Sequence, residues 1–120
     1  MKSIPQKILD YVNQLPKKDA FNSLVEDMGF THREAADILD VYIFEDIQFL
    51  PHGVVPGAIQ GSFGFPNPNG GEDLWISIVG GGEGLYGDGT TTFEVWGSYM
   101  EDPEGWLTKE KVTQKLLELQ

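Results

Sequence analysis

The chain changes character near residue 50, and this change limits the fold more than any other feature. Before it, apolar residues recur at helical spacing, as Ile4, Ile8 and Val12 do. After it, glycine and proline become frequent, and short apolar runs lie between turn residues. A helical first part followed by β structure is typical of the α+β class.

Three short helices are expected in the first part. Ser3 is placed to cap the first helix, and Pro16 ends it. The second helix is expected to cover residues 19–28, with Gly29 placed for a left-handed C-terminal cap.

The third expected helix begins with a capping box formed by Thr31 and Glu34. Asp37 and Asp40 are expected on its solvent side. The residues expected to face inward are Ala35, Ala36, Ile38, Leu39 and Tyr42.

The second part predicts a three-stranded antiparallel meander followed by a C-terminal helix. Turn residues separate the strands, and residues 102–105 are expected to turn the chain. Short connections favour antiparallel neighbours. Thr108 is placed to cap the last helix, which is expected to cover one face of the sheet. The expected strands are residues 58–65, 74–79 and 92–100, and the inward positions of the helix are Val112, Leu116 and Leu119.

A chain of 120 residues is expected to form a single domain, with residues 1–48 as its helical part and residues 54–120 as the meander and last helix. The absence of cysteine excludes a disulfide scaffold and a thiolate metal site. No apolar run approaches the roughly 20 residues of a membrane span, and the first residues lack the apolar region of a signal peptide. We therefore expect a cytoplasmic protein with no membrane partner.

Residues 34–108 contain no Lys or Arg, and this 75-residue segment carries 13 carboxylates. The net charge of −11 is therefore concentrated in the middle of the chain. These carboxylates must face water or a cationic partner, because burying an unpaired charge is costly. Direct binding of DNA or RNA is disfavoured, because that affinity comes from Lys and Arg on phosphates. The alternative is that acidity only keeps the protein soluble.

Catalytic and cofactor sites have little support in the sequence. Residues 82–87 match G-x-G-x-x-G, but a β segment follows them where a dinucleotide site needs a helix. The spacing of Glu83, Asp88 and Glu94 matches no calcium loop. The two histidines lie 20 residues apart with no cysteine, which is unlike a zinc site. We therefore expect no catalytic residue, no metal and no cofactor.

Alternation along the expected strands assigns side chains to two faces of the sheet. Trp75 on the second strand and Trp96 on the third fall on the same face. If that face is uncovered, tryptophans ringed by carboxylates form a recognition surface. The alternative is that the N-terminal helices cover it. On the third strand, the opposite face carries Phe93, Val95 and Tyr99.

The helical part allows two further interpretations. Residues 21–42 have the spacing of a helix-turn-helix, with Gly29 in the turn, but the exposed face of the second helix carries Arg33 among carboxylates. Residues 28–36, which begin Met-Gly-Phe, resemble the first loop and second helix of ubiquitin-associated domains. In that family the Met-Gly-Phe loop helps to contact a hydrophobic patch. Two helices packed around a glycine corner produce both patterns as well.

Residues 77–96 resemble a hairpin of small phage and prophage proteins, in which a Tyr-Gly turn, here Tyr86-Gly87, precedes a Phe-Glu-Val strand. The resemblance implies a mobile-element origin. Small, acidic, cysteine-free phage proteins are often inhibitors of host defence, such as anti-CRISPR or anti-restriction proteins. Some of them mimic the charge of DNA.

The function expected is non-catalytic: an acidic, phage-type inhibitor that occupies a basic surface of a host defence nuclease or another nucleic-acid-handling protein. Two alternatives stay open. One is a phage structural or assembly protein that self-associates through its sheet, for example as a homodimer. The other is a small helix-turn-helix-like regulator. The residues expected to contact a partner are Asp37, Asp40, Glu83, Tyr86, Asp88, Trp96, Glu101, Asp102 and Glu104.

Overall fold

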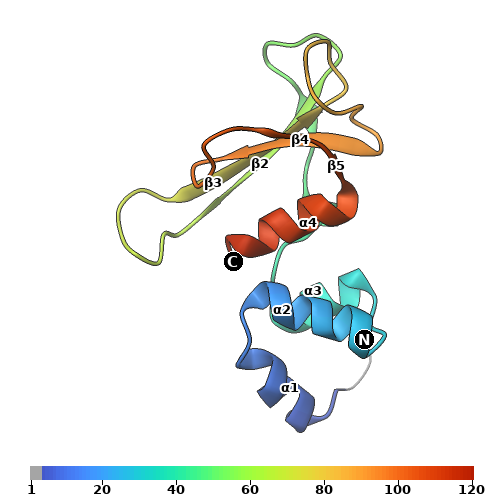
Figure 1. Ribbon diagram of the computed structural model, residues 1–120, viewed down its shortest axis with the longest axis vertical. Coiled ribbons are helices and arrows are strands. Elements are labelled where there is room, and N and C mark those ends of the chain that lie inside the picture. Colours follow the sequence, from blue (N-terminus) through green and yellow to red (C-terminus); the bar gives the residue numbers. More distant parts are fainter. Residues whose placement is uncertain (1–3) are drawn as a thin grey trace.

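Four α-helices and a five-stranded antiparallel sheet make up the described part of the chain, residues 4–120 of a computed structural model (Figure 1). The α+β class is therefore confirmed, whereas the expectation of three strands is wrong. The elements are α1 (Gln6–Asn13), α2 (Lys17–Asn22), the π-helical η1 (Ser23–Asp27), α3 (His32–Leu39), the 3-10 turn η2 (Phe44–Asp46), β1 (Leu50–Pro51), β2 (Ile59–Phe65), β3 (Leu74–Gly80), β4 (Thr92–Gly97), β5 (Glu104–Thr108) and α4 (Lys109–Glu118).

Proline and glycine mark the ends of the first two helices. Pro5 precedes α1, and the expected cap at Ser3 lies outside the described residues. Pro16 takes the N-cap position of α2, so this helix begins two residues earlier than expected. It continues as η1 and ends before Gly29, whose φ of +76° gives the left-handed turn predicted there.

The capping box of α3 is confirmed. The amide of Glu34 donates to Thr31 Oγ1 at 3.1 Å, and the amide of Thr31 donates to Glu34 Oε1 at 3.0 Å. The helix ends because Asp40 adopts a left-handed conformation with φ of +54°. This turn redirects the chain, so Tyr42 is 52% exposed and the expectation that it faces inward is wrong.

The sheet has the order β1-β2-β3-β4-β5, with every neighbouring pair antiparallel. Two strands were not expected. β1 has two residues, and β5 begins inside the segment that was expected only to turn. β4 ends at Gly97 rather than at residue 100, so the turn lies earlier and Glu104 already pairs with Val95. A register shift between Phe93 and Val95 marks this pairing as irregular.

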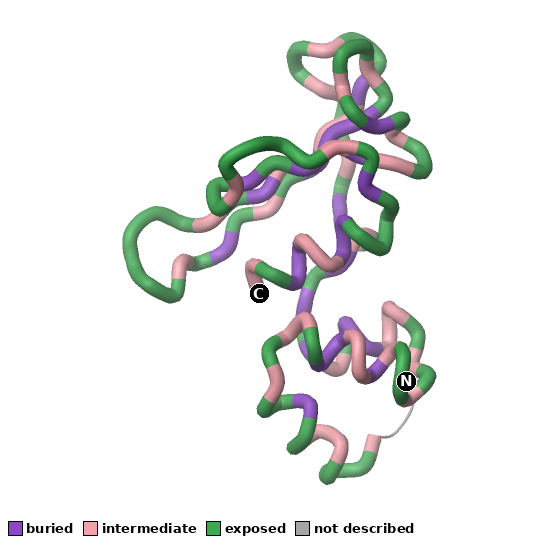
Figure 2. Tube along the Cα trace, viewed as in Figure 1, coloured by how far each residue is buried: buried purple, intermediate pink, exposed green. Residues whose placement is uncertain are grey.

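Helix α4 lies between the sheet and helices α1–α3 and contributes to two hydrophobic clusters (Figure 1). Val112 and Leu116 belong to the cluster under the sheet, together with Ile76 and Ile78. Leu117 belongs instead to the cluster of the N-terminal helices. Figure 2 shows the buried segments running along the strands and through α4. The expectation that the C-terminal helix covers one face of the sheet is confirmed.

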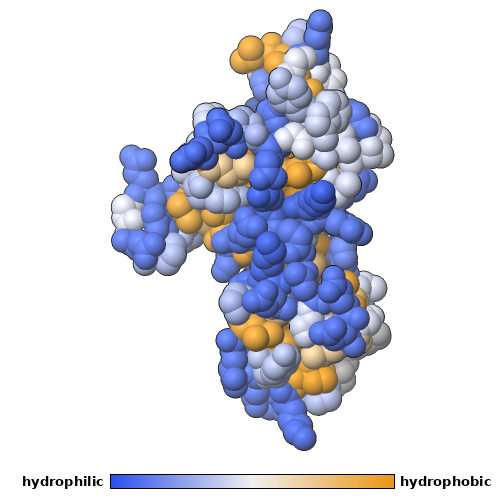
Figure 3. All heavy atoms as spheres, viewed as in Figure 1, coloured by the Kyte–Doolittle hydropathy of each residue, from blue (hydrophilic) through white to orange (hydrophobic). Residues whose placement is uncertain are grey.

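The N-terminal helices pack on α4 and therefore do not reach the other face of the sheet (Figure 1). The alternative that they cover the tryptophans is wrong, because Trp75 and Trp96 are exposed. Figure 3 shows a hydrophilic band across the middle of the molecule, over α4. Among the described residues, no helix is long and apolar enough to cross a bilayer.

Candidate partner-binding surface

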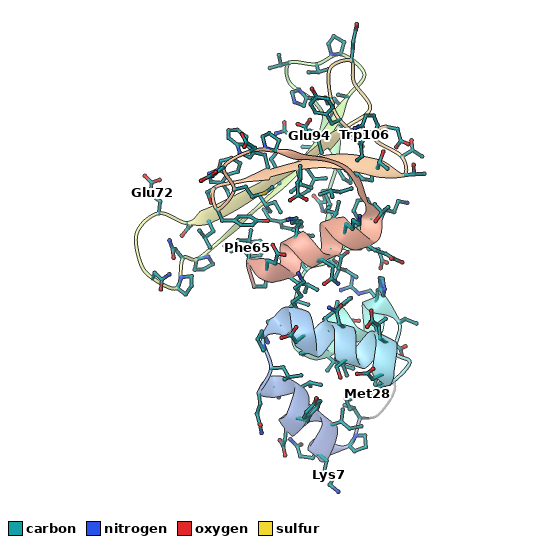
Figure 4. The ribbon with its side chains drawn as sticks, in the orientation of Figure 1. Lys7, Met28, Phe65, Glu72, Glu94 and Trp106 are labelled. Carbon is teal, nitrogen blue, oxygen red and sulfur yellow. The ribbon has the colours of Figure 1, made fainter. Side chains whose placement is uncertain are left out.

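The face of the sheet that points away from α4 carries all three tryptophans of the chain. Trp75 and Trp96 are 40% and 46% exposed, and their rings meet edge to face with centroids 5.3 Å apart. Trp106 is 61% exposed, and Figure 4 shows it beside Glu94 on this side of the sheet. We call the three tryptophans, together with Tyr86, the tryptophan face. Exposed tryptophans gathered on an uncovered sheet are typical of an interaction surface.

Small residues on neighbouring strands leave the tryptophan pair accessible from the β2 side. Ser77 pairs with Trp96 on one side and with Ser62 on the other. Gly64 is the partner of Trp75 on β2. Because neither Ser62 nor Gly64 has a large side chain, nothing on β2 shields the Trp75 ring.

The chain after β4 is tied to Trp75 through its backbone. The amide of Trp75 donates to Ser98 Oγ at 3.0 Å, and the amide of Ser98 donates to the carbonyl oxygen of Trp75 at 3.0 Å. A Cβ on Gly97 would lie 2.8 Å from that carbonyl oxygen and 2.7 Å from Tyr99 Cε1. Glycine is therefore required here for the close approach of this segment to the Trp75 backbone.

Asp88 organises the loop between β3 and β4. Its carboxylate accepts hydrogen bonds from the amides of Thr90, Thr91 and Thr92 at 2.7–3.0 Å. The hydroxyl of Thr91 donates a further bond at 2.7 Å. The Thr91 hydroxyl, followed by the three amides, holds the pKa of the Asp88 carboxyl well below its usual range. Asp88 is thus a structural anchor of the loop as well as an exposed charge.

The same loop is fastened to β5 at Tyr86. The amide of Tyr86 donates to Glu94 Oε1 at 3.1 Å, and the amide of Trp106 donates to the carbonyl oxygen of Tyr86 at 2.7 Å. Trp106 has a φ of +56°, and a Cβ on the preceding Gly105 would overlap the Cβ of Tyr86. These contacts fix the positions of Tyr86 and Trp106 although both side chains are about 60% exposed.

Four carboxylates gather at the end of the sheet next to Trp75. Glu72 and Asp73 lie in the β2–β3 loop, and Glu101 and Asp102 lie in the β4–β5 turn. Both connections lie at the same end because the strands are antiparallel. All four residues are exposed, and Figure 4 shows the Glu72 side chain pointing outward from its loop. We call these four residues the acidic end.

The nine residues expected to contact a partner do not form one patch. The positions fall into four parts of the molecule: α3 (Asp37, Asp40), the β3–β4 loop (Glu83, Tyr86, Asp88), β4 (Trp96), and the β4–β5 turn with the start of β5 (Glu101, Asp102, Glu104). The tryptophan face contains two of them and the acidic end two more. The α3 residues lie in the helical part, beyond α4 from the sheet (Figure 1).

Two of these carboxylates form ion pairs within the chain. Asp37 lies 3.1 Å from Arg33, and Glu104 lies 3.0 Å from Lys115. Both pairs are at least partly exposed, so each contributes little to stability. The charge available to a partner is nevertheless smaller at Asp37 and Glu104 than at Glu101 and Asp102.

Four residues of the surface were missing from the expected set: Trp75, Trp106, Glu72 and Asp73. Alternation did place Trp75 beside Trp96, and this was the signal that could have added it. Trp106 was not predicted as a surface residue because residues 102–105 were expected to turn the chain rather than to enter a strand. Glu72 and Asp73 belong to the surface only because the antiparallel strands place the β2–β3 loop and the β4–β5 turn at the same end of the sheet.

A cleft of about 340 Å³ lies where α3, η2 and α4 meet and includes His32, Phe44 and Lys109. The imidazole of His32 packs edge-on against Phe21, with centroids 5.4 Å apart. Lys109 Nζ lies 5.5 Å from the centroid of Phe44. Within residues 4–120, no three metal-ligating side chains are grouped so that they could hold an ion.

The segment that suggested a helix-turn-helix or a ubiquitin-associated domain is packed into the helical part. Met28 and Phe30 both lie against the N-terminal hydrophobic cluster. Arg33 forms ion pairs with Asp46 at 2.8 Å and with Asp37 at 3.1 Å. The hydrogen bond that the Arg33 guanidinium donates to the Asp46 carboxylate is the main cause that raises the pKa of Arg33.

The tryptophan face and the acidic end are therefore defined by geometry within this chain. No family model matches the chain, and neither a curated protein nor a solved structure matches it.

Proposed function

We propose that the chain is a non-catalytic binding protein whose tryptophan face docks on a basic surface of another protein. One observation carries the proposal: three exposed tryptophans share an uncovered sheet face in a segment, residues 34–108, without a single Lys or Arg. Aromatic side chains are the usual anchors at the centre of an interface. Carboxylates around them attract a cationic partner and reject an anionic one.

The basic partner we propose is a nucleic-acid-handling protein of the host, such as a defence nuclease. Such proteins hold phosphates with surfaces rich in Lys and Arg. A ligand that occupies this surface competes with nucleic acid, which makes it an inhibitor. The likeness of residues 77–96 to a phage hairpin is the reason for proposing a phage-type inhibitor, and the host cytoplasm is the corresponding site of action.

The test compares three versions of the chain in a nuclease-treated bacterial lysate. They are the wild type, the double variant Trp75→Ser/Trp96→Ser, and the control Tyr11→Ser. Tyr11 is 53% exposed on α1, so its loss removes an exposed aromatic ring away from the sheet. Captured proteins are identified at about 0.1 M and about 0.5 M salt, because charge-driven contacts weaken with ionic strength.

The decisive step uses the purified captured protein. Wild type and Tyr11→Ser should bind it and displace its nucleic acid, whereas the double variant should do neither. Equal binding by the double variant contradicts the proposed surface. Undiminished nucleic-acid binding in the presence of saturating wild type contradicts the proposed inhibition.

Self-association through the sheet is the second candidate, favoured by the same uncovered face. Sedimentation velocity distinguishes it, because the monomer has a mass of 13.3 kDa. A dimer that dissociates in Trp75→Ser/Trp96→Ser would support it. For the helix-turn-helix-like regulator we find no comparable observation, since Arg33 is already paired with two carboxylates.

A further inference from the structure

The sheet has an open edge along most of β2. The two residues of β1 pair only with Ile59 and Gln60. Beyond them, no residue in the described part of the chain pairs with residues 61–65 on this side. Native sheets usually blunt such an edge with Lys, Pro or an inward-pointing charge. Residues 59–65 contain none of these.

The orientation of the β2 backbone follows from its pairing with β1. The amide of His52 donates to the carbonyl oxygen of Ala58 at 2.8 Å, so Ala58 directs its backbone groups toward β1. Alternate residues of a strand direct their N–H and C=O groups to the same side. Ser62 and Gly64 therefore present their backbone groups at the open edge. Both residues are exposed.

A groove runs beside this edge. It has a volume of about 420 Å³ and is lined in part by Tyr42, Leu50 and Phe63. Tyr42 and Leu50 are 52% and 68% exposed, so the groove offers apolar surface to a ligand. The rings of Tyr42 and Phe63 lie 5.2 Å apart between centroids, and Phe65 continues the row at 5.9 Å from Phe63.

We propose that an extended, positively charged segment of the partner adds to the open edge of β2 as a further strand. This inference rests on the proposed function and specifies its binding mode. Backbone hydrogen bonds to Ser62 and Gly64 would hold the segment, as in other cases of strand addition. Alternate side chains of the segment face the Tyr42–Phe63 groove, and the others lie on the side of the tryptophan face.

The side chains of the segment that lie on the side of the tryptophan face should be Arg or Lys. Strands lie about 4.8 Å apart, so a strand added beside β2 is roughly 10 Å from β3. A long cationic side chain placed opposite Gly64 can cross that glycine and reach the ring of Trp75. A cation over an indole ring is attracted by the negative face of the π-system. The acidic end lies at the same end of the sheet and adds attraction for the same charges.

A second copy of the chain fits this edge less well. Each copy carries a net charge of −11, and pairing two β2 edges brings these charges together. A cationic segment is instead attracted by the negative charges of the chain. Strand addition by the partner is therefore favoured by charge complementarity.

The test uses a synthetic ten-residue peptide of alternating Arg and Val and measures amide hydrogen exchange of the protein by NMR. In the free protein, the amides of Ser62 and Gly64 should exchange quickly. At saturating peptide their exchange should slow at least about tenfold, because they become part of a ladder. A peptide of the same composition, N-methylated on the amides that would face β2, keeps its charge but should give no such protection.

Each outcome supports or contradicts strand addition, the proposed function, or both. Binding of both peptides without protection of Ser62 and Gly64 overturns strand addition but leaves the proposed function standing. Failure of both peptides to bind at low salt contradicts the proposed function as well. Protection that develops in the free protein as its concentration rises shows that a second copy takes the edge, and it overturns the inference. The variant Ser62→Pro, which removes one edge amide at a position where proline is tolerated, should weaken peptide binding at least about tenfold.

Discussion

Replacing Gly105 by alanine should destabilise the protein by disturbing the contact between β5 and the β3–β4 loop. The added Cβ would overlap the Cβ of Tyr86 and lie 3.0 Å from the Tyr86 carbonyl oxygen. That oxygen also accepts the 2.7 Å hydrogen bond from Trp106. Neither obstacle is the far end of a flexible side chain, so the backbone must move.

The expected cost follows from two opposing effects. Strain from overpacking costs about 1–3 kcal/mol. The change from glycine to alanine also restricts the unfolded chain, which offsets about 0.4–1 kcal/mol of that cost. The net loss should therefore be about 1–2 kcal/mol, which lowers a urea midpoint by roughly 1 M.

Gly64→Ala is the matched control on the same sheet. The nearest atom to its added Cβ is the carbonyl oxygen of Leu74 at 3.9 Å, an ordinary contact distance. This variant should be neutral or slightly stabilised. Urea unfolding followed by tryptophan fluorescence compares the two. Equal midpoints for Gly105→Ala and Gly64→Ala would refute the argument that the loop is held against β5 by this close approach.

Three further predictions concern the β3–β4 loop, the core and the cap of α3. Hydrogen bonds lower the pKa of the Asp88 carboxyl in the folded state. The ionised carboxylate therefore stabilises the folded state fully above about pH 4, and this stabilisation is lost progressively as the pH falls below that value. The thermal unfolding temperature of Asp88→Asn should therefore change less between pH 6 and pH 3 than that of the wild type. Leu117→Ala should cost about 2–5 kcal/mol in urea unfolding, whereas Leu50→Ala should stay within about 0.5 kcal/mol. Thr31→Ala should cost about 1 kcal/mol in the same assay, because it removes the capping box of α3.

Local rules predicted much of the fold. The capping box at Thr31, the left-handed turn at Gly29 and the strands β2 and β3 follow from residue types and spacing alone. Alternation also predicted that Trp75 and Trp96 lie together, which the 5.3 Å separation of their rings confirms. These features depend on neighbours close in sequence or on simple periodicity.

The missed strands depend on tertiary pairing. β1 is two residues long and includes Pro51, which sits at the position facing Ile59. β5 contains Gly105 and a tryptophan in a left-handed conformation, and both features weaken a strand pattern. Each strand exists because a longer neighbour supplies its hydrogen bonds. The periodicity of a segment does not show which neighbouring strand it will pair with.

The surface could be predicted only in part for the same reason. Counting charges identified a segment without cations, but it did not show that Lys115 reaches Glu104 or that Arg33 reaches Asp37 and Asp46. Nor could it show that the Asp88 carboxylate accepts hydrogen bonds from the amides of its own loop. The assembly of the acidic end from two separate connections needed the sheet itself.

The most direct test of the central claim uses intrinsic tryptophan fluorescence. Because all three tryptophans lie on the tryptophan face, their emission reports on that surface alone. The protein is titrated with the alternating Arg–Val peptide, and an alternating Glu–Val peptide serves as the control. The account predicts a saturable change with the cationic peptide that weakens at about 0.5 M salt, and no change with the anionic one. Emission that stays constant with the cationic peptide, or that responds equally to both peptides, would contradict the account.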